Sequence, residues 1–456
     1  MAAVILTSCI EDGVSSSPAD QPAFSVDTLD FGEVYKGQVT PTAKFMVYNR
    51  HDKIINISQI SLRGDAGRTF RLNVDGTSGS AFQNIEIRPN DSIYVMVEAT
   101  VPQSDGVTRV TGTVDFVTNG NTRSVVLAAT GLDVQVLKGL VIERDTVWTP
   151  GVPRQILDSL VVAPGVTLTL EGGSELLFHS GARFEVRGRL MANGTPEAPV
   201  IMTGDRKDNV VADIPFDVMS GQWGGLTFHT GAGGSRLSHT VIKNTSQGVM
   251  ADSVQSVNGQ GIALINCRIR NSDGCAFTGY FSDVTAVGTE FSDAAETPLL
   301  LCGGNISMTN VTVANYFLFS AIGYPGVTLT HYDEKTRQPD CQLPLMSARF
   351  ENCIFYGLAT DFSAGNLDGT DVWVNRCLFK SAGQDDEHFT ECIWDKDPLY
   401  YTVREEYIFD YRLRPDSPAI GMGHVFSNIT GWGTDFYGIQ RTQQPSLGAF
   451  EFVPAD

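Results

Sequence analysis

The sequence predicts an all-β chain in which a small β-sandwich precedes a solenoid of stacked parallel strands. Residues 24–133 alternate apolar and polar positions in short runs, residues 134–406 repeat a strand-like unit about every 22 residues, and 46 glycines punctuate the chain of 456 residues. Alternation with period two is typical of strands with one buried face, and a fixed period of about 20–50 residues is typical of solenoids. With 42% hydrophobic residues, the chain can bury a core.

The first residues predict a lipid-anchored N-terminus. An apolar run from Met1 ends in Leu6-Thr7-Ser8-Cys9. This ending resembles the lipobox of bacterial lipoproteins, and the resemblance implies that a lipid on Cys9 attaches the protein to the outer membrane. The alternative is a short buried strand with a chance cysteine, because the run is short for a signal peptide and lacks its basic residues.

The residues after the cysteine predict a tether. Ile10-Glu11-Asp12 is similar to the surface-export signal of Bacteroidetes lipoproteins, which implies exposure on the cell surface. The stretch from Gly13 to Pro22 is rich in Ser, Pro, Ala and Asp, a composition typical of flexible linkers. We therefore assign residues 1–9 to a signal remnant and residues 10–23 to a flexible tether.

Residues 24–133 predict the β-sandwich. Runs such as Phe45 to Tyr48 and Ile93 to Val97 are separated by turn residues, and about seven such runs fit one sandwich. The segments Leu29 to Val34, Asn90 to Ile93 and Val125 to Gly131 resemble the Hydin/MSP-like immunoglobulin family over nearly this whole region. The resemblance implies an immunoglobulin-like domain that serves as a spacer or a protein-binding module.

The second domain opens with brief strands that glycines separate too closely for helices. They are Val166 to Ser174, Phe184 to Thr195 and Gln222 to Leu226. These segments resemble the opening coils of bacterial right-handed parallel β-helix proteins, whose fold is that of the pectate-lyase-like superfamily. The resemblance implies that residues 134–406 form one right-handed parallel β-helix.

Seven copies of a three-residue unit support this solenoid. Their first residues lie 27, 22, 22, 42, 24 and 15 positions apart, and we interpret the step of 42 as two coils. Each unit places a small or thiol residue two positions before a larger apolar one, which puts both on one face of a strand. A single coil cannot bury this face, so stacked coils must form an internal ladder. The units are Thr240 to Ile242, Cys267 to Ile269, Thr289 to Phe291, Val311 to Val313, Cys353 to Phe355, Cys377 to Phe379 and Cys392 to Trp394.

The cysteines predict buried thiols instead of a disulfide framework. Lipidation of Cys9 leaves seven of the eight cysteines, an odd number that cannot all pair. Cys267, Cys353, Cys377 and Cys392 share one repeat position, and we interpret them as small buried hydrophobic residues. A bridge between Cys353 and Cys377 is the alternative. The sequence has no C-x-x-C or H-x-x-x-H spacing typical of zinc sites, and we expect no metal and no cofactor.

Residues 407–456 resemble the closing segment of many β-helix surface proteins. The resemblance rests on Leu413 to Ile420, Asp435 to Arg441 and Gly448 to Glu451. It departs at Ser446-Leu447, where an Asp-Ile pair is usual, so no role of that Asp carries over. We expect this segment to cap the last coils.

The charge balance restricts the partners. With 52 acidic against 32 basic residues, the formal net charge of -20 repels a phosphate backbone and removes the counterion release that drives nucleic-acid binding. We expect no nucleic-acid partner. Acidic polysaccharides are disfavoured for the same reason unless a local basic groove or bound calcium intervenes, so neutral glycans, proteins and cations are the easier ligands.

One acidic cluster is a candidate for catalysis. Asp385, Asp386 and His388 lie close together in sequence, and paired carboxylates perform acid/base chemistry in glycosidases. The accompanying motifs of polygalacturonases are missing, so we expect these residues to do no chemistry. Arg268 and Arg270 are the best candidates for the base of a calcium-dependent lyase, but we expect both to be simply exposed.

Aromatic residues in the long 42-residue step and after it favour sugar binding. We expect the step to form a projecting loop, and we identify Tyr324, Tyr332 and Trp373 as candidate stacking partners for sugar rings. Aromatic residues in a β-helix more often fill coils, and we interpret Trp223 and Trp394 as such fillers.

These observations favour a non-catalytic lipoprotein of the cell surface. In this hypothesis the sandwich is a stalk and the solenoid is a platform that binds a glycan or an outer-membrane protein partner. The alternative is a polysaccharide lyase or glycoside hydrolase, which would need convergent acids and bases in one groove. The fold alone does not choose between the two functions.

Overall fold

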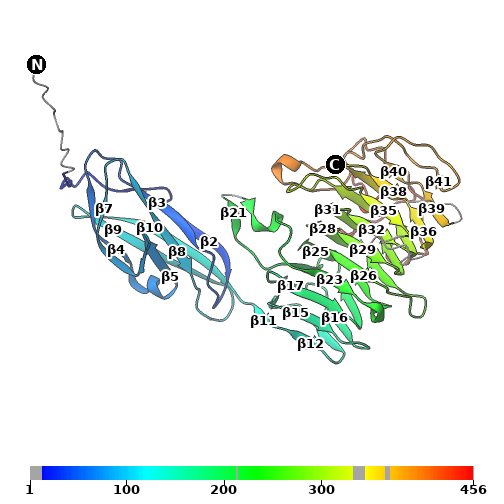
Figure 1. Cartoon of the computed structure of the whole chain (residues 1–456), viewed down its shortest axis with the longest axis horizontal. Coiled ribbons are helices and arrows are strands. Elements are labelled where there is room, and N and C mark those ends of the chain that lie inside the picture. The colour runs from blue at the N-terminus through cyan, green and yellow to red at the C-terminus, as the bar shows by residue number, and fades with distance from the viewer. Residues whose placement is uncertain (1–12, 212–213, 332–344, 365–369, 455–456) are drawn as a thin grey trace, which may run out of the picture. The chain divides into compact units, whose positions relative to one another are not determined.

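The computed structural model describes residues 13–211, 214–331, 345–364 and 370–454 (Figure 1). The chain divides into two compact units, Met1–Val134 with Lys207–Pro215 and Gln135–Arg206 with Phe216–Asp456. The described helices are short 3-10 helices, namely η1 (Gly64–Arg68), η2 (Phe216–Val218), η3 (Thr230–Ala232) and η5 (Arg404–Glu406). Within the described ranges, no helix is long and apolar enough to cross a membrane.

The N-terminal unit contains an immunoglobulin-like β-sandwich of two five-stranded sheets. One sheet has the order β1 (Ala23–Phe24), β3 (Ala43–Tyr48), β8 (Ser92–Ala99), β5 (Phe70–Val74) and β6 (Thr77–Gly79). The other has the order β2 (Thr28–Tyr35), β10 (Asn121–Leu132), β9 (Thr108–Thr118), β4 (Ile55–Leu62) and β7 (Ala81–Ile87). A separate antiparallel pair, β21 (Asn209–Val211) and β22 (Ile214–Pro215), belongs to the same unit.

The alternation in the sequence explains the core of the sandwich. In β8, Val95 and Val97 are buried, whereas Tyr94 and Met96 are exposed. Period-two alternation thus directs one face of the strand inward. Between the two sheets, the rings of Phe45 in β3 and Phe116 in β9 pack edge to face with centroids 6.2 Å apart.

Part of the segment that we expected to be a tether is hydrogen-bonded to the sandwich. Val14 forms an isolated parallel bridge with Ile54. The side chain of Asn119 donates to the carbonyl of Ser17 over 2.9 Å, and the side chain of Gln21 donates to another carbonyl of the sandwich, that of Thr118, over 3.0 Å. These bonds fix the stretch from residue 14 to residue 21 against its own domain.

The second unit is a right-handed parallel β-helix whose coils build three long parallel sheets (Figure 1). Sheet 1 comprises β11 (Gln135–Leu137), β14 (Arg154–Ile156), β17 (Glu175–Phe178), β20 (Val200–Gly204), β25 (Thr240–Thr245), β28 (Arg268–Ser272), β31 (Glu290–Ala294), β34 (Thr312–Asn315), β37 (Ile354–Gly357) and β40 (Leu378–Phe379). Sheet 2 comprises β12 (Leu140–Ile142), β15 (Ser159–Val162), β18 (Arg183–Val186), β23 (Gly225–Phe228), β26 (Val249–Asp252), β29 (Phe277–Tyr280), β32 (Leu299–Cys302), β35 (Val327–Thr330) and β38 (Phe362–Ala364). Sheet 3 comprises β13 (Thr146–Trp148), β16 (Thr167–Glu171), β19 (Arg189–Asn193), β24 (Arg236–Ser238), β27 (Ile262–Ile265), β30 (Val284–Val287), β33 (Gly304–Thr309), β36 (Leu345–Glu351), β39 (Asp371–Asn375) and β41 (Phe389–Thr390).

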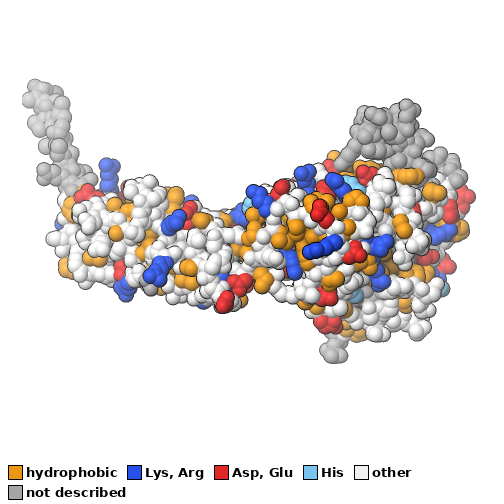
Figure 2. All heavy atoms as spheres, turned by 90° about the horizontal axis from the view of Figure 1, so that it is seen from below, with side chains coloured by type: hydrophobic (Ala, Val, Ile, Leu, Met, Phe, Trp, Pro, Cys, Tyr) orange, Lys and Arg blue, Asp and Glu red, His pale blue; other side chains and the backbone are white. Residues whose placement is uncertain are grey.

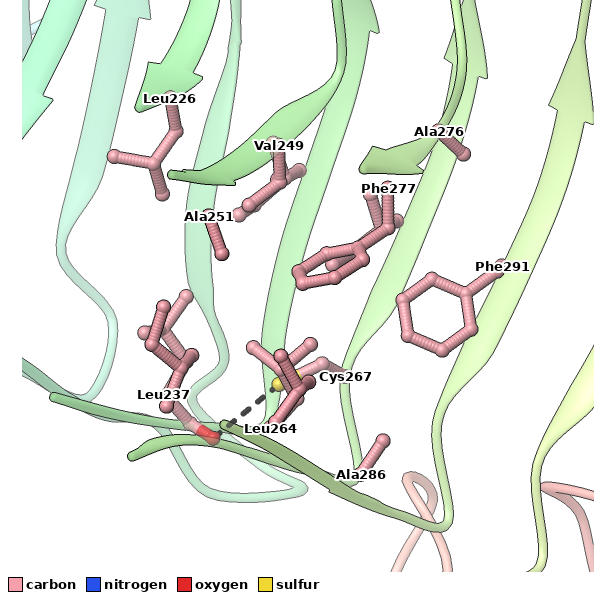
Figure 3. Packing of buried hydrophobic residues seen from close by; sticks show 14 of the residues in the cluster. Leu226, Leu237, Val249, Ala251, Leu264, Cys267, Ala276, Phe277, Ala286 and Phe291 are labelled. Atoms are coloured by element: carbon pink, nitrogen blue, oxygen red, sulfur yellow. Dashed lines mark hydrogen bonds between the residues drawn. The ribbon is translucent and has the colours of Figure 1, made fainter. Parts of the chain in front are cut away.

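The register of sheet 1 confirms the repeat alignment. In the first six units, the larger apolar residue pairs with its counterpart on the next coil, and these six residues form a buried column. The column is Ile242, Ile269, Phe291, Val313, Phe355 and Phe379. Leu226, Leu264 and Phe277 contribute to the same interior from sheets 2 and 3 (Figure 3).

The interpretation of the 42-residue step as two coils is wrong. Thr312 of β34 pairs directly with Ile354 of β37, so these strands belong to adjacent coils. The extra residues lie in the connections on either side of β35, and residues 332–344 are outside the described ranges. Loop closure entropy grows only slowly with length, so one coil accommodates such an insertion at little cost.

Each repeat unit follows a residue with positive φ at the corner between sheets 3 and 1. The φ values lie between 41° and 58°, and the residues are His239, Asn266, Gly288, Asn310, Asn352, Arg376 and Glu391. Asn and Gly tolerate this left-handed conformation better than most residues. The corner therefore explains why Asn and Gly occur so often immediately before the unit.

The thiol position of the unit is buried at Cys267, Cys353 and Cys377, as we predicted, but Cys392 is only half-buried. The buried thiols also form hydrogen bonds. Cys267 donates its thiol to the carbonyls of Leu237 and Ile265, each over 3.4 Å (Figure 3). Burial raises the pKa of the Cys267 thiol to about 12. Cys353 and Cys377 are likewise buried, and each donates its thiol to backbone carbonyls. Buried thiols of this kind are chemically unreactive.

The C-terminal segment lies along the outer face of sheet 1. Tyr411, Leu447 and Phe450 pack there against Ala314 and Ile354, and all five are buried. From β25 to β40, sheet 1 is therefore covered on both faces.

Candidate binding groove

An open groove of about 490 Å³ crosses the outer face of sheet 3. Its floor follows one row of paired residues on five successive coils: Arg236, Ala263, Thr285, Ser307 and Arg349. Neighbouring strands lie about 4.8 Å apart, so the row spans roughly 19 Å. We call this feature the sheet 3 groove.

The floor of the groove is lined mainly by small side chains. Ala263, Thr285 and Ser307 are small, and two of them offer hydroxyl groups. Larger residues of the same strands, such as Met308 and Phe350, point into the core. Since successive side chains of a strand alternate between its faces, the inward column of large residues leaves small polar residues outside.

One wall of the groove is formed by the connection between β26 and β27 and is held by Asp283. The carboxylate of Asp283 accepts hydrogen bonds from the Asn305 side chain over 2.7 Å and from the Ser256 backbone N–H over 2.8 Å. Burial acts to raise the pKa of Asp283, but these hydrogen bonds outweigh it and hold the pKa below its usual value. Ile429 and Thr430 of the C-terminal segment line the groove as well.

An exposed aromatic residue extends the row by one coil. Trp373 pairs with Arg349 across β36 and β39 and is 44% exposed. Its indole N–H donates to Asp371 over 3.2 Å, and the same carboxylate accepts hydrogen bonds from Arg349 at 3.0 and 3.1 Å. These bonds orient the ring at the end of the groove.

The sequence analysis missed this row, although the repeat alignment contains it. Arg236, Thr285, Ser307, Arg349 and Trp373 each lie four positions before the first residue of the next unit. Comparing the residues four positions before each unit would have identified this row. The alignment does not contain the walls, which come from the connection between β26 and β27 and from Ile429 and Thr430 of the C-terminal segment.

The acidic cluster has a structural role in the loop between β40 and β41. Asp385 accepts hydrogen bonds from the Cys392 backbone N–H over 3.2 Å and from the Trp394 indole over 3.1 Å. Asp386 accepts from the backbone N–H of His388 over 2.8 Å. These three candidate residues do not line the sheet 3 groove.

The structure does not bring the candidate aromatic residues together. Tyr324 is 53% exposed and lies in the connection before β35 of sheet 2, whereas Trp373 lies on sheet 3. Tyr332 lies outside the described residues, as does Cys9, the candidate lipidation site. Trp223 is fully buried, and the half-buried Trp394 packs against the core, so both help to fill the solenoid interior.

The expectation that Arg268 and Arg270 are exposed is wrong. Each side chain is only 16% exposed, because the C-terminal segment covers this part of sheet 1. Arg268 pairs with Glu290 over 2.7 Å, and Arg270 pairs with Asp293 over 3.2 Å. Burial acts to raise the pKa of Glu290, but the two arginines outweigh it and hold the pKa below its usual value.

A second, smaller hollow of about 270 Å³ adjoins these arginines. Lys243 also lines it, and its ammonium group lies 2.7 Å from the carboxylate of Asp217. The cations of this hollow are thus already neutralised by neighbouring acids. Basic and acidic side chains are likewise interspersed on the visible surface of the molecule (Figure 2).

A metal centre is not evident in the part of the chain that the structure describes. No group of three or more His, Cys, Asp or Glu side chains there is arranged to hold a metal ion.

Comparisons with known proteins give only distant likenesses. No family model and no curated protein matches the chain. Among solved structures, a family 123 glycoside hydrolase from Clostridium perfringens, described for glycolipid glycan hydrolysis, aligns at a TM-score of 0.18 and 8% identity over 24% of this chain and 25% of its own. The ASH/PapD-like domain 7 of human CEP192 aligns at a TM-score of 0.19 and 11% identity, over 29% of this chain and 97% of the domain. The chain thus spans a quarter of the length of the hydrolase, and at these TM-scores neither likeness bears on function.

Proposed function

We propose that the chain is a surface lipoprotein of the Bacteroidetes type whose solenoid binds a glycan along the sheet 3 groove without cleaving it. The observation that carries this proposal is the row from Arg236 to Trp373, which combines polar groups, small floor residues and an exposed aromatic ring. The Hydin/MSP-like sandwich is the stalk in this proposal.

The groove chemistry favours a sugar chain over a peptide strand. The backbone groups of sheet 3 are engaged by neighbouring coils along the groove, so a peptide cannot add a strand to this face. The floor instead offers side-chain hydroxyl and guanidinium groups, which exchange hydrogen bonds with sugar hydroxyls. Trp373 provides the apolar ring on which a sugar stacks.

The acids at the groove favour binding over catalysis. A general acid or base works best with a pKa near the operating pH, whereas the hydrogen bonds to Asp283 hold its pKa below the usual value. Asp371 is engaged by Arg349 and Trp373. Both carboxylates therefore organise the groove.

A glycan array tests the proposal directly. We expect the full chain to bind one class of linear glycan. Trp373→Ala should weaken binding by about tenfold, which corresponds to about 1.4 kcal/mol, the order of magnitude of one lost aromatic contact. Ser307→Trp should block the floor. Tyr324→Ala is the matched control, because this residue is also an exposed aromatic residue but belongs to another side of the coil, and binding should be unchanged.

Two outcomes would overturn this proposal. Binding that is lost in Tyr324→Ala but kept in Trp373→Ala and Ser307→Trp would move the site away from the groove. Release of reducing ends or of unsaturated sugars from a polysaccharide panel would favour the lyase or hydrolase alternative.

The anchor is tested separately. Leu6-Thr7-Ser8-Cys9 motivates the proposal that a lipid holds the protein on the outer membrane. Cys9→Ala should no longer incorporate a labelled fatty acid and should leave the membrane fraction. Unchanged labelling of this variant, or a soluble wild-type protein in the cells of its source, would contradict the proposal.

A further inference from the structure

Two arginines without acidic partners lie at the β19–β24 end of the sheet 3 groove. Arg236 lines the floor, and its Nε donates a weak hydrogen bond to Ser238 over 3.3 Å. The two terminal nitrogens of Arg236 have no hydrogen bond or ion pair with any residue that the structure describes. The same holds for the whole side chain of Arg189 on the neighbouring strand β19.

A glycine leaves room for the Arg189 guanidinium beside the start of β24. Gly234, two residues before Arg236, lies beside the Arg189 guanidinium, and a Cβ at this position would lie 3.2 Å from Arg189 Nε. A side chain at position 234 would therefore press on the guanidinium. Without one, Arg189 lies over the start of β24, next to the groove floor.

At the other end of the groove, the arginine carries no uncompensated charge. Arg349 shares the carboxylate of Asp371, so its charge is neutralised within the protein. Lys243, Arg268 and Arg270 are also paired with acids. Unpaired positive charge at Arg189 and Arg236 therefore marks one end of the groove in a chain whose net charge is -20.

Guanidinium groups bind planar or tetrahedral oxyanions well. Their N–H groups form a fixed fork that matches carboxylate and sulfate oxygens, and such charge-assisted hydrogen bonds are stronger than neutral ones. The long-range repulsion by the acidic protein does not prevent this, because salt screens it over about 10 Å while the local contacts persist.

We infer that the glycan carries a carboxylate or sulfate group on the sugar at the β19–β24 end, and that Arg189 and Arg236 bind this group. The sugars over Thr285, Ser307 and the neutralised Arg349 carry no charge. This inference rests on the proposed function and specifies its ligand as a glycan that is acidic at one end and neutral along the rest of the groove.

Matched pairs of oligosaccharides test the inference. The probes are linear glucan, xylan, galactan and mannan tetrasaccharides, each in a neutral form and in a form with one terminal uronic acid or one terminal sulfate. We expect the acidic member of a pair to bind about tenfold more tightly, as charge-assisted hydrogen bonds predict. The preference should weaken as the salt concentration is raised.

Variants assign the preference to the two arginines. In Arg189→Gln with Arg236→Gln, the acidic and neutral members should bind equally, while neutral glycans bind as they do to the wild type. Arg183→Gln is the matched control, since Arg183 is an exposed arginine on sheet 2, and it should keep the preference.

The outcomes separate this inference from the proposed function. Equal binding of acidic and neutral glycans by the wild type refutes the anionic ligand but leaves glycan binding intact. A preference that survives the double substitution refutes the role of the two arginines. Failure of every pair to bind refutes the proposed function and the inference together.

Discussion

Asn310 joins two coils to the C-terminal segment, and its replacement should release that segment. The residue is fully buried at a corner, with φ of 51°. Its amide group donates to the carbonyls of Ser446 over 3.0 Å and Gly448 over 3.2 Å. Its carbonyl oxygen accepts from Asn352 over 3.1 Å and from the Trp432 indole over 2.8 Å.

Asn310→Ala removes all four hydrogen bonds and leaves their buried partners unsatisfied. At about 1 kcal/mol for each bond, the loss is about 4 kcal/mol, and the left-handed backbone adds about 1 kcal/mol because Ala tolerates it less well than Asn. Asn310→Gly should cost only the hydrogen-bond part. Asn258→Ala should cost about 1 kcal/mol or less, because Asn258 has a φ of 53° but is exposed and has no side-chain hydrogen bond with a described residue.

Denaturant unfolding followed by Trp fluorescence measures these differences. Hydrogen exchange over residues 430–450 should show that Asn310→Ala exposes the C-terminal segment before the coils unfold, since local opening follows the loss of local contacts. If Asn310→Ala shifts the unfolding midpoint no more than Asn258→Ala does, the reasoning is refuted. Equal midpoints for Asn310→Ala and Asn310→Gly would refute the backbone part alone.

Three further predictions concern single sites. Burial lowers the pKa of His239 below 6.5, so the contribution of the neutral imidazole to stability is present above pH 6.5 and is lost as the pH falls through the lower folded-state pKa. His239→Asn should therefore flatten the decline of the thermal midpoint in this pH range. An unchanged decline would show that His239 does not cause it. Gly288→Ala should destabilise by about 1–3 kcal/mol more than Gly259→Ala, because its Cβ would lie 2.1 Å from the buried Asn266 amide oxygen and would displace it. Gly259→Ala has open space and should cost about 1 kcal/mol. Equal midpoints for the two variants would rule out the clash. Asp385→Ala should lower the free energy of unfolding by about 1 kcal/mol, because it removes two hydrogen bonds. It should leave glycan binding unchanged. A melting curve measures the first effect and a binding isotherm the second.

Much of the solenoid was predictable because its constraints are local and repeated. The two-residue spacing in Cys267 to Ile269 and in Cys353 to Phe355 places both side chains of each unit inward, and the register of sheet 1 follows from stacking these units. The number of coils in the long step was not predictable. Thr312 and Ile354 are neighbours whatever the length of the loop between them, since closing a longer loop adds little free energy.

The candidate site was less accessible to sequence reasoning. Trp373 was named as a candidate stacking partner for its aromatic ring alone, without the row in which it lies. Arg268 and Arg270 were expected to be exposed, because a strand pattern alone directs them outward and does not reveal what returns to cover them. Both are buried by a segment that begins more than a hundred residues later and brings Tyr437 and Phe409 against them.

By itself, the sequence determined which face of the strands in each repeat unit is buried, because alternation acts within a few residues. Only the tertiary structure decided which outer face remains open. The C-terminal segment packs along sheet 1 and leaves sheet 3 with its row from Arg236 to Arg349 accessible. That choice depends on contacts such as Asn310 with Ser446, which join residues far apart in the chain and form only when the stacked coils present them together.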